Sequence, residues 1–127
     1  MQYDKYDNYD ALCRDILNKD SSIRFVGIAN SIGNLVGTAY RKDLIPLLTN
    51  EETSQYAIKA VLRAATREDF ELNLGKLQYS IGKYEKLVRA TVPIPTPKED
   101  ADRRFYLLLS FDVDSNVKSI IEDKILS

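Results

Sequence analysis

The chain has 127 residues, 44% of them hydrophobic and 29% charged, and its formal net charge at pH 7 is -1. These values are typical of one soluble globular domain, and so small a net charge argues against binding to nucleic acid or anionic lipid through bulk electrostatics. Histidine is absent and Cys13 is the only cysteine, which excludes Ser-His and Cys-His nucleophile pairs, imidazole metal ligands and an internal disulfide.

The composition also predicts location and chemistry. A single cysteine is typical of a reducing compartment, and the polar, acidic start MQYDKYDNYD does not resemble a signal peptide. No apolar run approaches the roughly 20 residues of a membrane-spanning helix. We therefore expect a cytoplasmic protein without catalytic, cofactor-binding or metal-binding residues, which neither binds nucleic acid nor inserts into a membrane.

The first predicted element is an amphipathic helix over residues 8–19. Its apolar side chains recur at helical spacing; they are Tyr9, Leu12, Cys13, Ile16 and Leu17. Asp7 or Asn8 is placed to cap the first turn. Because Cys13 belongs to the apolar face, we interpret it as a small buried hydrophobic side chain rather than a reactive thiol.

A β-hairpin is predicted next, in the segment FVGIANSIGNLVGTAYR. Residues 23–29 and 35–41 alternate with the period of a strand, and Gly33 between them supplies the positive φ of a short turn. A strand rather than a helix follows this glycine, so we interpret the segment as a turn and not as a phosphate-binding loop. Ile32 at the tip either folds back onto the sheet or contacts a partner. Gly37, inside the second strand, indicates close backbone packing.

A long helix is predicted over residues 50–74. Thr49 and Glu52 form a capping box at its start, and Gly75 is placed to end it. One wide face is apolar and rich in alanine: Ala57, Ile58, Ala60, Val61, Ala64, Ala65 and Leu72. Small side chains let a helix approach its neighbour closely, so these alanines either pack on the chain's own sheet or form a dimer contact with a second copy.

Two charged features interrupt the pattern of this helix. Glu68 falls within the apolar face, where a lone carboxylate is costly. The helix therefore bends or unwinds before it, or Glu68 meets an arginine, or that end faces solvent or a second subunit. The opposite face carries a cationic stripe, which is either solvated or docks an acidic partner: Tyr56, Lys59, Arg63 and Arg67.

Three strands and a helix complete the chain. Residues 75–83 and 87–94 alternate as strands, and residues 93–104, with three prolines and six charges, are predicted to be a loop. Residues 105–111 read as a buried strand. Asp114 or Ser115 caps a last helix whose apolar residues are Val117, Ile120, Ile121 and Ile125. The order α-β-β-α-β-β-β-α predicts one α+β domain over residues 1–127, in which a five-stranded antiparallel sheet is packed against helices.

This order of elements resembles the roadblock/dynein light-chain superfamily, which has a profilin-like layout. The resemblance rests on IRFVGIANSIGNLVG, RKDLIPLL, AVLRAATREDFELNLG and LLLSFDVD, and it covers nearly the whole chain. More narrowly, the chain is similar to a group of short archaeal proteins typical of ammonia-oxidising archaea. The proline-rich segment and the polar N-terminal extension depart from the superfamily pattern.

The resemblance implies a non-catalytic interaction or regulatory module. Domains of this kind usually dimerise through the middle helix and the edge strand after it, here residues 50–74 and 77–83. They often act as scaffolds or as partners of small GTPases. Carried onto this chain, the dimer interface would include Leu77, Tyr79 and Ile81 together with Ala57, Ala60 and Ala64.

A second hypothesis is a PAS-like sensor of small molecules. Profilin-like sheets resemble those of sensor domains that hold a ligand between sheet and helices. The pocket would then be lined by Phe25, Tyr79 and Tyr106. An enzyme would have to work with tyrosine, lysine, arginine or carboxylates alone, and we regard it as the weaker alternative.

Overall fold

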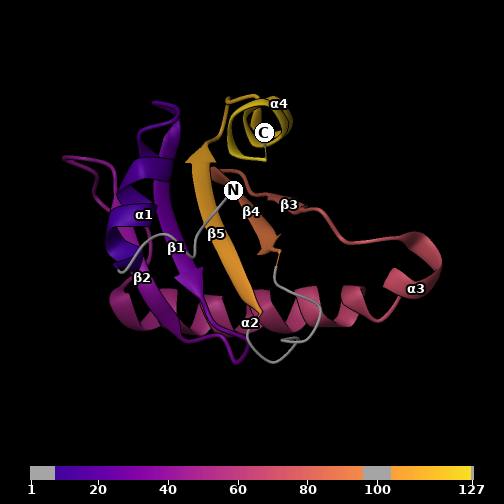
Figure 1. Cartoon of the computed structure of the whole chain (residues 1–127). Helices are drawn as coiled ribbons and strands as arrows, with labels where there is room; N and C mark the ends of the chain where they lie inside the picture. The colour runs from indigo at the N-terminus through magenta and orange to yellow at the C-terminus, as the bar shows by residue number, and fades with distance from the viewer. Residues whose placement is uncertain (1–7, 96–103, 127) are drawn as a thin grey trace.

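The computed structural model describes residues 8–95 and 104–126. Five antiparallel strands form one sheet in the order β2-β1-β5-β4-β3. Helices α1 and α4 pack on one face of the sheet and helix α2 packs on the other (Figure 1). The α+β fold expected from the sequence is therefore confirmed. The elements are α1 (Tyr9–Leu17), β1 (Ile23–Ala29), β2 (Leu35–Tyr40), α2 (Asn50–Glu68), α3 (Glu71–Leu74), β3 (Ser80–Lys83), β4 (Leu87–Ile94), β5 (Phe105–Asp112) and α4 (Val117–Ile120), which continues as a π-helix η3 (Ile121–Ile125).

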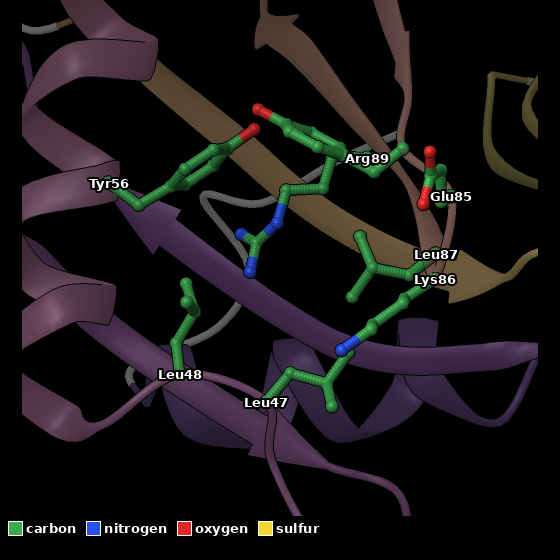
Figure 2. A pocket seen from close by; sticks show the side chains of 8 residues that line it. Leu47, Leu48, Tyr56, Glu85, Lys86, Leu87 and Arg89 are labelled. Atoms are coloured by element: carbon green, nitrogen blue, oxygen red, sulfur yellow. The ribbon is translucent and has the colours of Figure 1, made fainter.

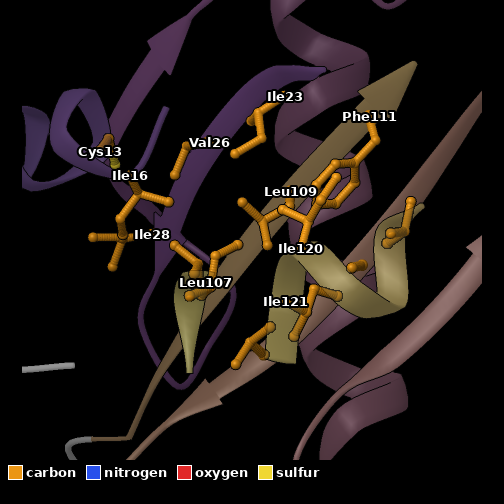
Figure 3. Packing of buried hydrophobic residues seen from close by; sticks show 14 of the residues in the cluster. Cys13, Ile16, Ile23, Val26, Ile28, Leu107, Leu109, Phe111, Ile120 and Ile121 are labelled. Atoms are coloured by element: carbon orange, nitrogen blue, oxygen red, sulfur yellow. The ribbon is translucent and has the colours of Figure 1, made fainter. Parts of the chain in front are cut away.

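The two faces of the sheet carry cores of different size. The larger core joins α1, α4 and η3 to alternate residues of β1, β4 and β5, and Figure 3 shows Phe111 and Leu109 of β5 facing the last helix. The smaller core lies under α2 and holds Ala29, Tyr106, Leu108 and the inner face of the helix. Cys13 is fully buried in the larger core, and burial raises the pKa of its thiol to about 12. This agrees with a hydrophobic rather than a reactive role.

The glycines of the β1–β2 hairpin have the roles expected of them. Gly33 has a φ of +87° at the turn, where its amide donates to the Asn30 carbonyl at 2.9 Å. It also packs against the backbone of Ile58 in α2, so the hairpin tip meets that helix. Gly37 lies against Tyr9 at the start of α1. The turn therefore serves packing, and no helix N-terminus follows it.

Helix α2 begins as predicted and ends earlier. The side chain of Thr49 accepts from the Glu52 amide at 3.1 Å, and the Glu52 carboxylate accepts from the Thr49 amide at 2.9 Å. The helix stops at Glu68, and a separate turn of helix, α3, ends at Gly75 with a φ of +86°. The single helix expected over residues 50–74 is therefore broken at residues 69–70.

Two further boundaries differ from the sequence-based expectation, and a third is settled where two expected elements overlapped. A strand was expected over residues 75–83, but β3 pairs with β4 only over Ser80–Lys83. Residues 75–79 lie outside the strand. Strand β4 has the bounds 87–94 expected for it, so Pro93, which the expected loop over residues 93–104 also included, belongs to the strand and pairs with Tyr106 of β5. Proline is tolerated there because β3 begins opposite Thr91, so β3 does not pair with Pro93 and needs no amide hydrogen from it. The last helix begins after Asn116, and Ser115 donates to the Asp112 carbonyl at 2.5 Å instead of capping the helix.

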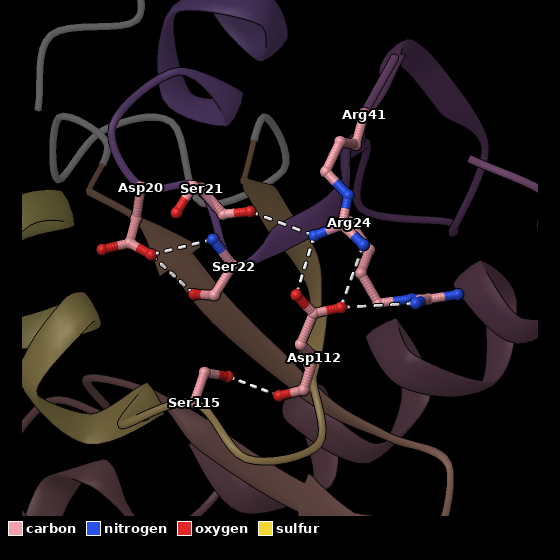
Figure 4. A network of polar contacts seen from close by, with 7 residues as sticks. All are labelled: Asp20, Ser21, Ser22, Arg24, Arg41, Asp112 and Ser115. Carbon is pink, nitrogen blue, oxygen red and sulfur yellow. Dashed lines mark hydrogen bonds and ion pairs between the residues drawn. The ribbon is translucent and has the colours of Figure 1, made fainter. Parts of the chain in front are cut away.

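Two carboxylates accept several hydrogen bonds near the start of β1 and the end of β5, where Asp20 precedes β1 and Asp112 ends β5 (Figure 4). Asp112 accepts from Arg41 at 2.8 and 3.0 Å and from Arg24 at 3.4 Å. These hydrogen bonds, that of Arg41 above all, lower the pKa of Asp112. Asp20 accepts from Lys124 at 2.7 Å and from the amide and hydroxyl of Ser22 at 2.9 and 2.6 Å. These contacts lower the pKa of Asp20 from 3.8 to about 2.

Replacement of Gly37 tests the contact between β2 and α1. A Cβ atom there would lie 2.6 Å from the Tyr9 Cβ and 2.7 Å from its carbonyl carbon, so Gly37→Ala should reduce the free energy of unfolding by about 1–3 kcal/mol. Gly82 also lies in a strand, but the atom nearest to a Cβ placed there is 4.0 Å away. Gly82→Ala should therefore change the free energy of unfolding by less than about 0.5 kcal/mol. Urea unfolding of both variants measures this, and equal losses would contradict it.

Asp20 gives the fold a predictable dependence on pH. Asp20→Asn should lower the free energy of unfolding by about 1 kcal/mol at neutral pH. Because the folded pKa lies below the ordinary value, this contribution is present above pH 3.8 and is lost as the pH falls to about 2. Urea titrations across that range should show the two proteins converging. Asp114→Asn, at an exposed position, is the control. If the free energies of unfolding of wild type and Asp20→Asn still differ at about pH 2, the pH dependence is not due to Asp20.

Candidate interaction site

The alanines of α2 face the chain's own sheet. Ala57, Ala60 and Ala64 are 0%, 1% and 1% exposed, and they pack with Tyr106 and Leu108 of β5. Of the two arrangements that the sequence left open for these alanines, packing on the chain's own sheet or contact with a second copy, the structure has the first. Side chains so deeply buried cannot themselves contact a second copy, so any dimer contact through α2 would have to use its other faces.

The predicted edge residues have three different environments. Strand β3 is an edge of the sheet, because β4 is its only neighbour among the described strands. Ile81 on this strand is 43% exposed. Leu77 packs against the core under α2. Tyr79 packs against the core on the other face, where its hydroxyl donates to Glu122 and this contact raises the pKa of Tyr79. Of the three, Ile81 is the most exposed, whereas Leu77 and Tyr79 are half-buried.

Helix α3 presents apolar side chains that sequence analysis did not single out as exposed. Phe70, Leu72 and Leu74 are 58%, 96% and 82% exposed. Figure 1 shows α3 projecting past the β3 edge, away from the sheet. The helical periodicity placed Leu72 on the face that carries the alanines, but the break at residues 69–70 turns it outward. Large exposed apolar side chains in one segment are typical of an interaction surface.

The break follows from the contacts of Glu68. Its carboxylate is 8% exposed, forms an ion pair with Arg104 and accepts from the Tyr106 hydroxyl at 2.5 Å. Burial is the main reason that the pKa of Tyr106 is raised. Glu71 contributes a second carboxylate, which accepts from the Leu77 amide at 2.8 Å. Of the alternatives for Glu68, the arginine partner is confirmed, whereas a bend or unwinding before Glu68 is wrong, because α2 includes Glu68 and ends after it.

The cationic stripe borders the β3 edge. Tyr56, Arg63 and Arg67 line a shallow groove with β3. Arg63 lies over the Tyr56 ring, its guanidinium carbon 5.6 Å from the ring centroid. Lys59 is exposed on the same helix. Ile32 is 70% exposed and does not fold back onto the sheet, but it lies at the hairpin tip on the far side of α2. The stripe and Ile32 therefore do not form one surface.

A pocket of about 440 Å³ opens between α2, the connector at residues 44–48 and the start of β4 (Figure 2). It is lined by Leu47, Leu48, Tyr56, Tyr84, Glu85, Lys86, Leu87 and Arg89. The Arg89 guanidinium carbon lies 3.9 Å from the centroid of the Tyr56 ring. Sequence analysis missed this pocket, although one signal was present, since Arg89 is the only charged residue in the apolar run LVRATVPI.

The pocket proposed from sequence does not form. Tyr79 packs in the core beside α4, whereas Tyr106 packs in the core beneath α2, so the sheet separates the two rings. Phe25 is 5% exposed and lies 4.8 Å from the ring of Tyr40, centroid to centroid. A ligand site lined jointly by Phe25, Tyr79 and Tyr106 is therefore wrong for this fold.

Comparison with known proteins defines the fold class. No family model matches the chain, and no curated protein matches it either. The similar solved structures include the gliding protein MglB from Thermus thermophilus, with 12% identity over 94% of this chain and 82% of that one and a TM-score of 0.68. They also include a Roadblock/LC7 domain from Streptomyces avermitilis, with 7% identity over 92% of this chain and 88% of that one and a TM-score of 0.66. A third is MglB in a tetrameric arrangement, with 13% identity over 87% of this chain and 74% of that one and a TM-score of 0.66. The chain therefore has the roadblock/LC7 fold.

Two kinds of site are absent from the described residues. No helix within residues 8–95 and 104–126 combines the length and hydropathy required to cross a bilayer. Within the same ranges, no three acidic or cysteine side chains are clustered as a metal site would require. The features that remain for function are the surface around β3 and α3, the cationic stripe and the pocket at Arg89.

Proposed function

We propose that the chain is a non-catalytic regulatory module of the cytoplasm, which works as a homodimer and presents its paired surface to a signalling partner. The observation that carries this is the free edge of β3 beside the exposed α3. An unpaired strand edge offers backbone donors and acceptors to another strand. Pairing of β3 with β3 of a second copy would continue the sheet across a two-fold axis.

The apolar side chains next to this edge support the same arrangement. In one chain, Leu72 and Leu74 of α3 are almost fully exposed, and Ile81 of β3 is exposed on the strand itself. A second copy paired at β3 would lie beneath the projecting α3 and could cover these residues. MglB, one of the similar structures, occurs in a tetrameric arrangement. The interface proposed here consists of β3 and α3, with the buried alanines of α2 as support for the helix.

Light scattering coupled to size exclusion tests the dimer. We expect a mass near twice 14.5 kDa across a dilution series. Leu72→Glu and Ile81→Glu should each raise the dissociation constant by about tenfold or more, because each places a carboxylate in an apolar contact. Ile45→Glu is the matched control, since Ile45 is 85% exposed but lies in the connector away from β3. A wild-type monomer at high concentration, or dimers unaffected by both variants, would contradict this interface.

The class of partner comes from the resemblance seen in the sequence, which implies a small GTPase. The cationic stripe is the surface that we assign to this partner, because Tyr56, Lys59, Arg63 and Arg67 lie together at one side of α2. Positive charge there would speed association with an acidic surface. The proposed partner is therefore a small GTPase with an acidic face, held by the dimer as a scaffold.

Charge reversal on the stripe tests this partner. Lys59→Glu combined with Arg67→Glu should slow association with a Ras-type small GTPase from the same organism by about tenfold at low salt, and less at high salt. Surface plasmon resonance with nucleotide-loaded GTPase measures the rates. Lys42→Glu, at an exposed position outside the stripe, should leave them unchanged. Equal rates for all three proteins would exclude the stripe as the partner surface.

A further inference from the structure

Arg89 is the most unusual side chain in the chain. It comes from β4 on the α2 side of the sheet and is only 9% exposed. In the described parts of the chain, no hydrogen bond or ion pair reaches its guanidinium. The guanidinium instead makes a cation–π contact with the face of the Tyr56 ring. An aromatic face stabilises a cation but leaves most of the N–H donors of a guanidinium without an acceptor.

The guanidinium is not sealed from water, because no fully buried side-chain nitrogen or oxygen in the described residues lacks a hydrogen-bond partner. The donors of Arg89 that no protein group accepts from are therefore open to the pocket that it lines, where an anion could accept from them. The other buried polar side chains here, Thr53, Thr91 and Ser110, are neutral. On the same side of the sheet the half-buried Glu68 does have an ion-pair partner, Arg104. Arg89 thus has the features of a group whose partner arrives from outside the chain.

The free donors of Arg89 face an apolar pocket. Figure 2 shows its guanidinium in the middle of the lining, with Tyr56 and the leucines around it. Leu47, Leu48 and Leu87 supply apolar walls. The pocket volume of about 440 Å³ is within the usual range of small-molecule sites. We propose that this pocket binds a small monocarboxylate with an apolar body, whose carboxylate pairs with Arg89.

The charges of the lining define the class of ligand. Arg89 and Lys86 are cationic and Glu85 is anionic, so the lining carries a net charge of +1. One negative charge therefore matches it better than the two or more of a nucleotide or phosphate monoester. The planar guanidinium can hold both oxygens of a carboxylate at once. An aromatic or branched aliphatic body would fill the remaining space between the leucines.

This pocket does not depend on the proposed dimer. Its walls come from the connector, the start of β4 and the first half of α2, whereas the dimer contact is assigned to β3 and α3. The two proposals can therefore fail separately. A chain that binds such a carboxylate as a monomer would have the pocket without the dimer.

Isothermal titration calorimetry with 2-naphthylacetate and its neutral isostere 2-naphthylacetamide tests the pocket. The wild-type protein should bind the carboxylate at least about tenfold more tightly than the amide. Arg89→Met should remove this preference, with a loss of about 10- to 100-fold in affinity for the carboxylate. Arg89→Met should still unfold in one cooperative thermal transition, because the guanidinium has only its stacking contact with Tyr56 to lose.

Two further variants make the test specific. Arg63→Met removes the other arginine that stacks on Tyr56 but does not line this pocket, and it should change affinity by less than about threefold. Leu48→Trp should fill the pocket and abolish binding of both compounds, even if Arg89→Met does not fold. The proposal is overturned if the wild type does not bind 2-naphthylacetate at millimolar concentration, if the amide binds equally well, or if Arg63→Met loses as much affinity as Arg89→Met.

Discussion

The close approach of α2 to the sheet is the contact on which the rest of this structure depends. Its inner face is made of alanine at positions 57, 60 and 64, so the helix can lie directly on β4 and β5. A helix is narrower than the sheet that it covers. The α2 face of the sheet is therefore covered in the middle and left open towards the start of β4, where Leu87 and Arg89 line the pocket. The buried alanines and the open pocket are two results of one packing arrangement.

A second contact decides what lies beyond the end of this helix. The ion pair of Glu68 with Arg104 and the hydrogen bond from Tyr106 join the last turn of α2 to β5. With its carboxylate held there, the chain leaves the helix at Asp69 and forms α3 outside the sheet. The exposure of Leu72 and Leu74 follows from that change of direction. The half-buried pair of Glu68 and Arg104 thus lies where the chain changes direction and turns Leu72 and Leu74 outward.

Most of the fold could be predicted because its signals are local. Alternation predicts β1, β2 and β5, the capping box at Thr49 predicts the start of α2, and the positive φ of Gly33 is required by its turn. The break after Glu68 could not be predicted, because no glycine or proline marks it and its cause, Arg104, is 36 residues further along the chain. The pocket was missed for a related reason: it needs the connector near Leu48 to lie beside β4, which no periodicity encodes. The lone arginine in an apolar strand was the available signal, and its meaning depended on knowing which face it occupied.

Pro93 has a consequence for how the sheet resists unwanted assembly. Beyond Thr91, strand β4 no longer pairs with β3, and only Lys76 and Leu77 of the chain before β3 border it at a pocket beside Pro93. A proline has no amide hydrogen to offer, and its ring obstructs a neighbouring strand. A strand of another molecule would therefore meet Pro93, which cannot donate a hydrogen bond to it, just where the pairing of β4 with β3 stops. Open-ended growth of the sheet into fibres is disfavoured on this side, and only the short segment Ser80–Lys83 is left for an ordered, closed association.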